Sequence, residues 1–171
     1  MKMNFLSLRN YILVFITGLI LSSCSKDPTA TDDLIGTWTA GTSTFTAMVG
    51  SKTLTQYFTD VMGLTAAEAQ QFTDLLNQGI QQSFTGTIQI KSNGTYTSSM
   101  GGTTDTGTWS LSSDGKKLTI DSSTEAPMTF DVIELTSSKL QLQILESISE
   151  DLNGDDTPEL ININVVVSFT K

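Results

Sequence analysis

Apolar residues recur at every second position through most of this chain, a period that is typical of β-strands with one buried face. In KLQLQI at 139–144, the alternation puts Leu140, Leu142 and Ile144 on one face. Similar stretches lie at 34–40, 43–49, 84–91, 95–100, 106–111, 117–120, 128–135 and 160–170. Because a half-apolar sheet must bury one face and protect its edges, we expect an all-β, antiparallel up-and-down barrel of about eight strands.

Two segments after the first strand break this period. In 53–64 the apolar residues follow helical spacing, and Thr53 with Gln56 fits a capping box, in which each side chain hydrogen-bonds to the other residue's backbone. The segment 65–82 repeats this pattern with a capping box of its own. We therefore expect a two-helix insertion over 53–82. It would either plug the end of the barrel or act as a moving lid.

The first 23 residues are typical of a signal peptide. Lys2 and Arg9 give a positively charged start, and the apolar run YILVFITGLIL follows at 11–21. That run makes only roughly 16 Å of helix, whereas the core of a bilayer needs ~30 Å. We expect residues 1–23 to direct export and then to be removed.

LSSC at 21–24 resembles the lipobox of bacterial lipoproteins and ends in Cys24, the one cysteine of the chain. The resemblance implies that Cys24 carries a thioether-linked diacylglycerol and that its amine is acylated after cleavage. Two or more acyl chains hold a protein stably at a membrane. SKDP at 25–28 resembles the surface-export signal of lipoproteins from Bacteroidetes-type envelopes. We expect an outer-membrane lipoprotein, in the inner leaflet or exposed at the surface, with residues 24–33 as the lipidated cysteine and a polar tether.

The composition excludes several classes of activity. The chain has no histidine and one cysteine, so it cannot form a Ser-His-Asp or Cys-His catalytic group, a disulfide within the chain, or a His- or multi-Cys zinc site. The net charge is −9, with 18 acidic residues, and such a surface repels nucleic acid. Since the carboxylates lie mostly in polar turns and not in an apolar cleft, we expect no enzymatic activity.

The tripeptide GTW occurs twice, at 36–38 and 107–109, with Gly and Trp on the same face of a strand. LIGTW at 34–38 resembles the G-x-W opening of lipocalins, and GTWSLSSDGKKL at 107–118 resembles the central hairpin of lipocalin-like domains in Bacteroidetes lipoproteins. The resemblance covers 34–171 and implies a calycin-type barrel that binds a small hydrophobic ligand. The candidate residues of the barrel interior and lid are Trp38, Phe58, Phe72, Phe84, Ile88, Trp109, Leu111, Leu142 and Val165. For the two tryptophans, the alternative role is plain core packing.

An acidic loop, SEDLNGDDTPEL, precedes the last strand at 149–160. Its oxygen-bearing residues resemble the spacing of calcium loops, with side chains at positions 1, 3, 5 and 9 and a backbone carbonyl at 7. The residues in those positions are Asp151, Asn153, Asp155, Glu159 and Thr157. The alternative is a solvated hairpin loop that turns at Asn153 and Gly154. Calcium is the one cofactor for which the sequence offers ligands.

Two functions fit this sequence. The first is a membrane-anchored barrel that binds a small hydrophobic molecule in the cell envelope. The second is a barrel with a filled core that acts as a structural or interaction module and binds protein or glycan. Eight-stranded barrels have just enough interior for side chains or for one small ligand. An interior cavity therefore distinguishes the two.

Overall fold

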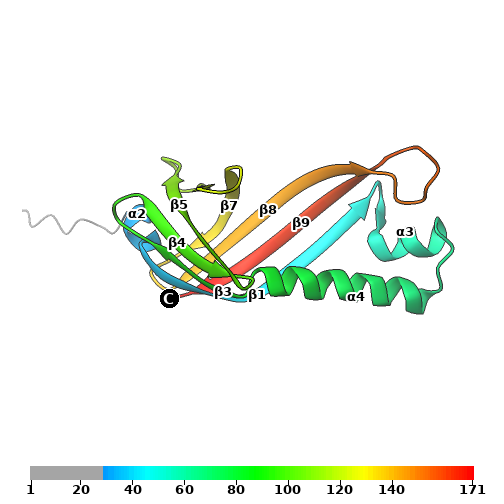
Figure 1. Cartoon of the computed structure of the whole chain (residues 1–171), viewed down its shortest axis with the longest axis horizontal. Coiled ribbons are helices and arrows are strands. Elements are labelled where there is room, and N and C mark those ends of the chain that lie inside the picture. Colours follow the sequence, from blue (N-terminus) through cyan, green and yellow to red (C-terminus); the bar gives the residue numbers. More distant parts are fainter. Residues whose placement is uncertain (1–28) are drawn as a thin grey trace, which may run out of the picture.

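The structure is a computed structural model that describes residues 29–171 (Figure 1). The predicted signal peptide at 1–23 and Cys24 lie outside these described residues.

Eight antiparallel strands close into an up-and-down barrel, as the alternation predicts. Each strand pairs with the next along the chain, and β1 pairs with both β3 and β9 and so closes the sheet. The eight strands are β1 (Gly36–Val49), β3 (Gly86–Ile90), β4 (Thr95–Met100), β5 (Thr103–Leu111), β6 (Lys117–Ser122), β7 (Met128–Leu135), β8 (Lys139–Glu150) and β9 (Glu159–Thr170). The short strand β2 (Lys52–Thr53) forms a hairpin with the end of β1.

Three strands are longer than the barrel and extend beyond it as an arm (Figure 1). The stretches predicted separately at 34–40 and 43–49 form one strand, β1, whose register with β9 shifts between Ala40 and Ser43. Before this shift β1 pairs with β3 and, at Thr39 and Ala40, also with β9. After the shift it pairs with β9 and β2 only. Strand β8 continues to Glu150 and pairs with β9 over its whole length. We call the paired segments 46–49, 145–150 and 159–164 the arm.

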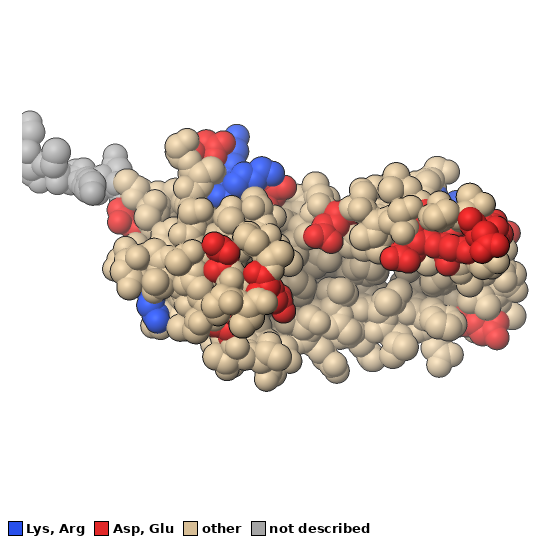
Figure 2. Space-filling model, turned by 45° about the horizontal axis from the view of Figure 1, so that its top comes forward, with Lys and Arg blue, Asp and Glu red and all other residues tan. Residues whose placement is uncertain are grey.

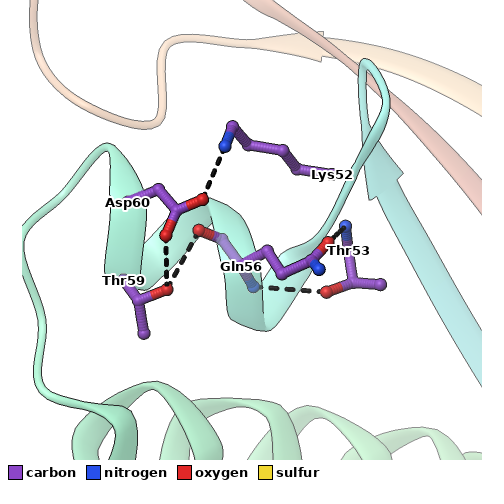
Figure 3. A network of polar contacts seen from close by, with 5 residues as sticks. All are labelled: Lys52, Thr53, Gln56, Thr59 and Asp60. Carbon is purple, nitrogen blue, oxygen red and sulfur yellow. Dashed lines mark hydrogen bonds and ion pairs between the residues drawn. The ribbon is translucent and has the colours of Figure 1, made fainter.

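The two predicted helices are confirmed as α3 (Leu54–Asp60) and α4 (Ala66–Ser83). Both begin with the capping box that the sequence predicts. Figure 3 shows the box of α3, where the Thr53 hydroxyl accepts from the Gln56 N–H at 3.2 Å and the Gln56 side chain accepts from the Thr53 N–H at 2.9 Å. An ion pair between Lys52 and Asp60, 2.6 Å apart, joins β2 to the end of the helix.

These helices lie along the arm and do not cover the end of the barrel (Figure 1). Ala69 of α4 is fully buried, and the Thr55 and Thr73 hydroxyls of the two helices lie 3.0 Å apart. The larger Phe72 and Leu76 remain 53% and 43% exposed. Small residues let α3 and α4 approach closely. The expectation of a plug that buries Phe72 over the barrel is therefore wrong.

A short helix that the sequence did not predict, α2 (Ala30–Leu34), packs at the barrel end opposite the arm. It occupies part of the segment expected to be tether. Leu34 is fully buried, and its carbonyl accepts a hydrogen bond of 2.7 Å from the Trp38 indole N–H. The Lys171 ammonium lies 4.6 Å from the centre of the Trp38 ring and donates to the Asp33 carbonyl. Residues from both ends of the described chain thus close this end of the barrel.

The buried side chains form two clusters, one inside the barrel and one between the arm and α3. The barrel cluster consists of Leu34, Trp38, Ile90, Tyr96, Leu118, Leu140, Leu142, Val165, Val167 and Phe169. The arm cluster consists of Ala47, Val49, Leu54, Tyr57 and Ile161. The described part of the chain therefore holds a core of its own. None of its helices is both long enough and apolar enough to cross a bilayer.

Replacing Gly107 with alanine should destabilise the barrel, because a Cβ there would lie 2.0 Å from the Asp121 carbonyl oxygen and 3.0 Å from Cε1 of Tyr96. We expect the free energy of unfolding to fall by roughly 1–3 kcal/mol, as for an overpacked core. Gly79→Ala is the control, since a Cβ on this helical residue meets nothing within 4 Å. That variant should be more stable than the parent by up to about 1 kcal/mol. Chemical denaturation compares the two, and equal stabilities would contradict the close approach at Gly107.

Candidate functional site

The barrel encloses a cavity of about 130 Å³. Most of its wall is apolar and comes from the inward faces of six strands and from Phe84, which directly follows α4. The apolar residues that line it are Phe84, Ile88, Ile90, Met100, Leu118, Ile120, Phe130, Leu140, Leu142, Val167 and Phe169. Three polar residues complete the wall: Tyr96, Ser98 and Asp105.

The strand alternation explains why these side chains meet. Ile88, Ser98 and Asp105 occupy paired positions on three successive strands, so they lie side by side on one face of the sheet. The same face of β5 continues through Gly107 and Trp109, and every second residue from Asp105 to Leu111 is partly buried. Asp105 therefore faces the interior although it is an acid.

Tyr96, Asp105 and Ser122 are joined by hydrogen bonds, and Ser98 pairs with Asp105 across the strands. We call these four residues the polar corner. The Tyr96 hydroxyl donates to one carboxylate oxygen of Asp105. The Ser122 hydroxyl donates to the other at 2.9 Å. Gly107, which pairs with Tyr96 across the strands, leaves room for the Tyr96 ring.

This arrangement fixes the charges of the polar corner. The hydrogen bond from Tyr96, with help from Ser122, lowers the pKa of Asp105 below its usual value. Burial, followed by the hydrogen bond to Asp105, raises the pKa of Tyr96 to about 12. At neutral pH the cavity therefore presents an ionised carboxylate, and the phenol stays neutral and donates to it.

The sequence-predicted ligand residues fall into three groups in the structure. Phe84, Ile88 and Leu142 line the cavity. Four others pack in or against the barrel core without lining the cavity: Trp38, Trp109, Leu111 and Val165. Phe58 and Phe72 lie on the helices beside the arm, with ring centroids 5.9 Å apart, and do not reach the cavity.

Sequence reasoning missed the polar corner. The signal was present, since Asp105 stands two residues before Gly107 in the series of inward positions, and Tyr96 and Ser98 alternate with Met100 in the same way. An acid or hydroxyl at a predicted inward position of a barrel strand is the mark that would have revealed it.

The acidic loop is held by its own hydrogen bonds. The Asp151 carboxylate accepts from the backbone N–H groups of Gly154 at 2.7 Å and Asp156 at 2.9 Å. Asp155 accepts from the Thr157 N–H at 2.8 Å, and Glu159 accepts from the Tyr57 hydroxyl and from the Leu152 N–H. These oxygens shape a hairpin loop.

The carboxylates of this loop do not converge on one point. Within residues 29–171, no three acidic side chains are grouped as a metal site requires. Of the predicted calcium ligands, Asp151, Asp155 and Glu159 are therefore not grouped as a site of three carboxylates. The other two, Asn153 and Thr157, lie in the same loop, and calcium binding stays a prediction. Figure 2 shows the acidic side chains of this region gathered at the end of the molecule remote from α2.

Comparison with known proteins finds similarity to solved structures and to no family model or curated protein. No model of a known protein family matches the chain, and no curated protein matches it. Among solved structures, the chain is similar to a DUF4847 family protein from Bacteroides vulgatus ATCC 8482, with 18% sequence identity and a TM-score of 0.35. The match covers 79% of this chain and 91% of that chain.

Removing the Tyr96 hydroxyl should raise the pKa of Asp105 toward its usual value, because that hydrogen bond is the largest cause of the lowered pKa. In the parent protein, a carboxylate whose folded-state pKa is lowered contributes stability above about pH 4, and this contribution is lost as the pH falls through the folded-state pKa. Tyr96→Phe should therefore lose less stability in acid than the parent. Carboxyl NMR titration measures the pKa directly.

The control for this titration is Tyr57→Phe, which removes a similar hydroxyl from the arm cluster. It should leave the titration of Asp105 unchanged. If Tyr96→Phe left the pKa of Asp105 where it is, the hydrogen bond would not be what lowers it.

Proposed function

We propose that this chain is a non-catalytic binding protein whose barrel holds a small, mainly apolar ligand. The observation that supports it is the cavity of about 130 Å³ inside the barrel. A cavity of roughly 150 Å³ lined by Leu, Ile and Phe takes up benzene. The ligand, or the part of it that enters the barrel, is therefore about the size of one ring or a short branched alkyl group.

The ligand enters from the arm side. At the other end, the buried Leu34 and Trp38 and the α2 helix close the barrel. On the arm side, Phe84 and Met100 line the cavity, and Met100 is the last residue of its strand. Methionine adapts its flexible side chain to irregular ligands, so it suits the entrance of a binding site.

A lipid anchor at Cys24 would orient this entrance away from the membrane. The described structure begins at Thr29. The chain from Cys24 to Thr29 can span at most roughly 18 Å. The α2 end of the barrel would then lie near the outer membrane. The arm and the ligand entrance would point into the periplasm or the medium. On this proposal the protein would act in the cell envelope, where apolar molecules need carriers.

The second candidate function, a surface interaction module, has an observation in its favour as well. Large apolar side chains are exposed on the helices, in the turn after α3 and on the arm, remote from the proposed anchor. They are Val61, Met62, Phe72, Leu75, Leu76, Leu145, Ile148 and Leu160. Exposed apolar groups of this kind suit contact with a protein partner. The cavity favours the carrier over this alternative, because a module that acts only through its surface needs no space inside.

A soluble form, residues 25–171, should bind a ligand when it is mixed with an extract of envelope lipids. Gentle native mass spectrometry of the recovered protein should then show the added mass of the ligand. Ser98→Leu should abolish this adduct, because Ser98 lines the cavity and leucine would fill it. Ser99→Leu is the matched control, since Ser99 is the adjacent residue and its side chain is exposed. A bare mass for the parent after every exposure would contradict the carrier function and favour the interaction module.

Replacing Cys24 with alanine should abolish both acylation and membrane association. The full-length chain, expressed in a bacterium with lipoprotein processing, should incorporate labelled fatty acid and sediment with the outer membrane. Cys24→Ala should do neither. The same labelling of the parent and the variant would show that Cys24 is not the lipidated residue.

A further inference from the structure

We propose that the cavity selects its ligand by the polar group that the ligand carries: it accepts an apolar molecule with a neutral or cationic hydrogen-bond donor, such as a hydroxyl or ammonium, and rejects a carboxylate. This inference rests on the proposed function and narrows the class of ligand. It follows from the charge, the hydrogen-bonding capacity and the position of the polar corner.

The charge of the cavity wall has one sign. Asp105 is an acid among the lining residues, and no lysine or arginine is among them. The chain has no histidine, and its only arginine is Arg9, in the predicted signal peptide. A ligand carboxylate would therefore meet an anion and find no cation to pair with.

The Asp105 carboxylate also has room for one more donor. A carboxylate has about four sites that can accept hydrogen bonds. Tyr96 donates to one of its two oxygens and Ser122 donates to the other. A hydroxyl or ammonium group on the ligand would fill one of the remaining sites.

Ser98 supplies a second polar contact beside the first. It pairs directly with Asp105 across β4 and β5, and it lines the same cavity. Its hydroxyl can both donate and accept. A ligand hydroxyl could thus donate to Asp105 and accept from Ser98, while its apolar part packs on residues such as Ile88 and Leu142.

A ligand carboxylate would be disfavoured for two reasons. Two carboxylates close together in an apolar site cannot both stay ionised without a large cost, so one must take up a proton. Asp105 resists protonation because Tyr96 and Ser122 donate to its ionised form. The ligand would have to enter protonated, which lowers its apparent affinity at neutral pH. The barrel is therefore a poor carrier of free fatty acids.

The test uses three probes that share one ring and differ in the polar group: benzyl alcohol, benzylamine and benzoate. We would titrate each into residues 25–171, which contain both hydrophobic clusters, and follow binding by NMR at neutral pH. We expect the alcohol and the amine to bind at least about tenfold more tightly than benzoate, a difference of about 1.4 kcal/mol.

Asp105→Asn tests whether this carboxylate is the cause, since asparagine keeps the shape and removes the charge. We expect the variant to bind benzylamine at least about tenfold more weakly than the parent does. Its affinity for benzyl alcohol should be nearly unchanged, and it should bind benzoate as tightly as the alcohol. The control is Asp121→Asn, which removes a charge from the exposed outer face of β6. This variant should bind the three probes in the same order of affinity as the parent.

The outcomes separate the two proposals. If benzoate bound the parent as tightly as the alcohol and the amine did, the selectivity would be refuted and the carrier function would stand. The selectivity would also be refuted, and the carrier function would stand, if Asp105→Asn bound the three probes in the same order of affinity as the parent. If none of the probes bound, both proposals would be overturned. The order of the three probe affinities for the parent tests the selectivity even if the Asp105→Asn variant does not fold.

Discussion

The pairing of β1 with two different neighbours determines the architecture of this protein. Its first residues, 36–39, pair with β3, and residues 39–49 pair with β9 on both sides of the register shift between Ala40 and Ser43. Without the first part the sheet would stay open. Without the second there would be no arm for α3 to pack on. One strand thus builds both the closed barrel and the extension that carries the helices.

Closure has a direct consequence for the interior. In a barrel of this size, every inward position either fills the space or borders a cavity. The α2 end is filled by Leu34 and Trp38, both fully buried. Elsewhere in the barrel, the inward positions include Ser98, Asp105 and Gly107, which are small or polar. They leave a space with apolar walls and one charged group, and this space is what distinguishes the barrel from a filled module.

Much of this fold could be predicted from the sequence, because the two-residue period directly reflects which side chains face inward. The capping boxes likewise located both helices, since Thr53 and Thr65 bond the backbone locally. The length of β8 could not be predicted, because residues 145–150 are all exposed and therefore lack the alternation of buried apolar residues that marks the other strands. The position of α4 depends on tertiary packing around Ala69. Asp105 was missed because an acid in a Thr-rich stretch suggests a turn, although its position in the alternation places it inside.

The most direct test of the central claim, that the barrel is hollow and takes up apolar molecules, is methyl NMR of residues 25–171 during the addition of benzene. The methyl signals of Ile88, Leu142 and Val167, which line the cavity, should shift and saturate together. Those of Leu145 and Leu160, which are 61% and 56% exposed on the arm, should not. Shifts confined to the exposed methyl groups, or no saturable shift at all, would contradict a hollow barrel.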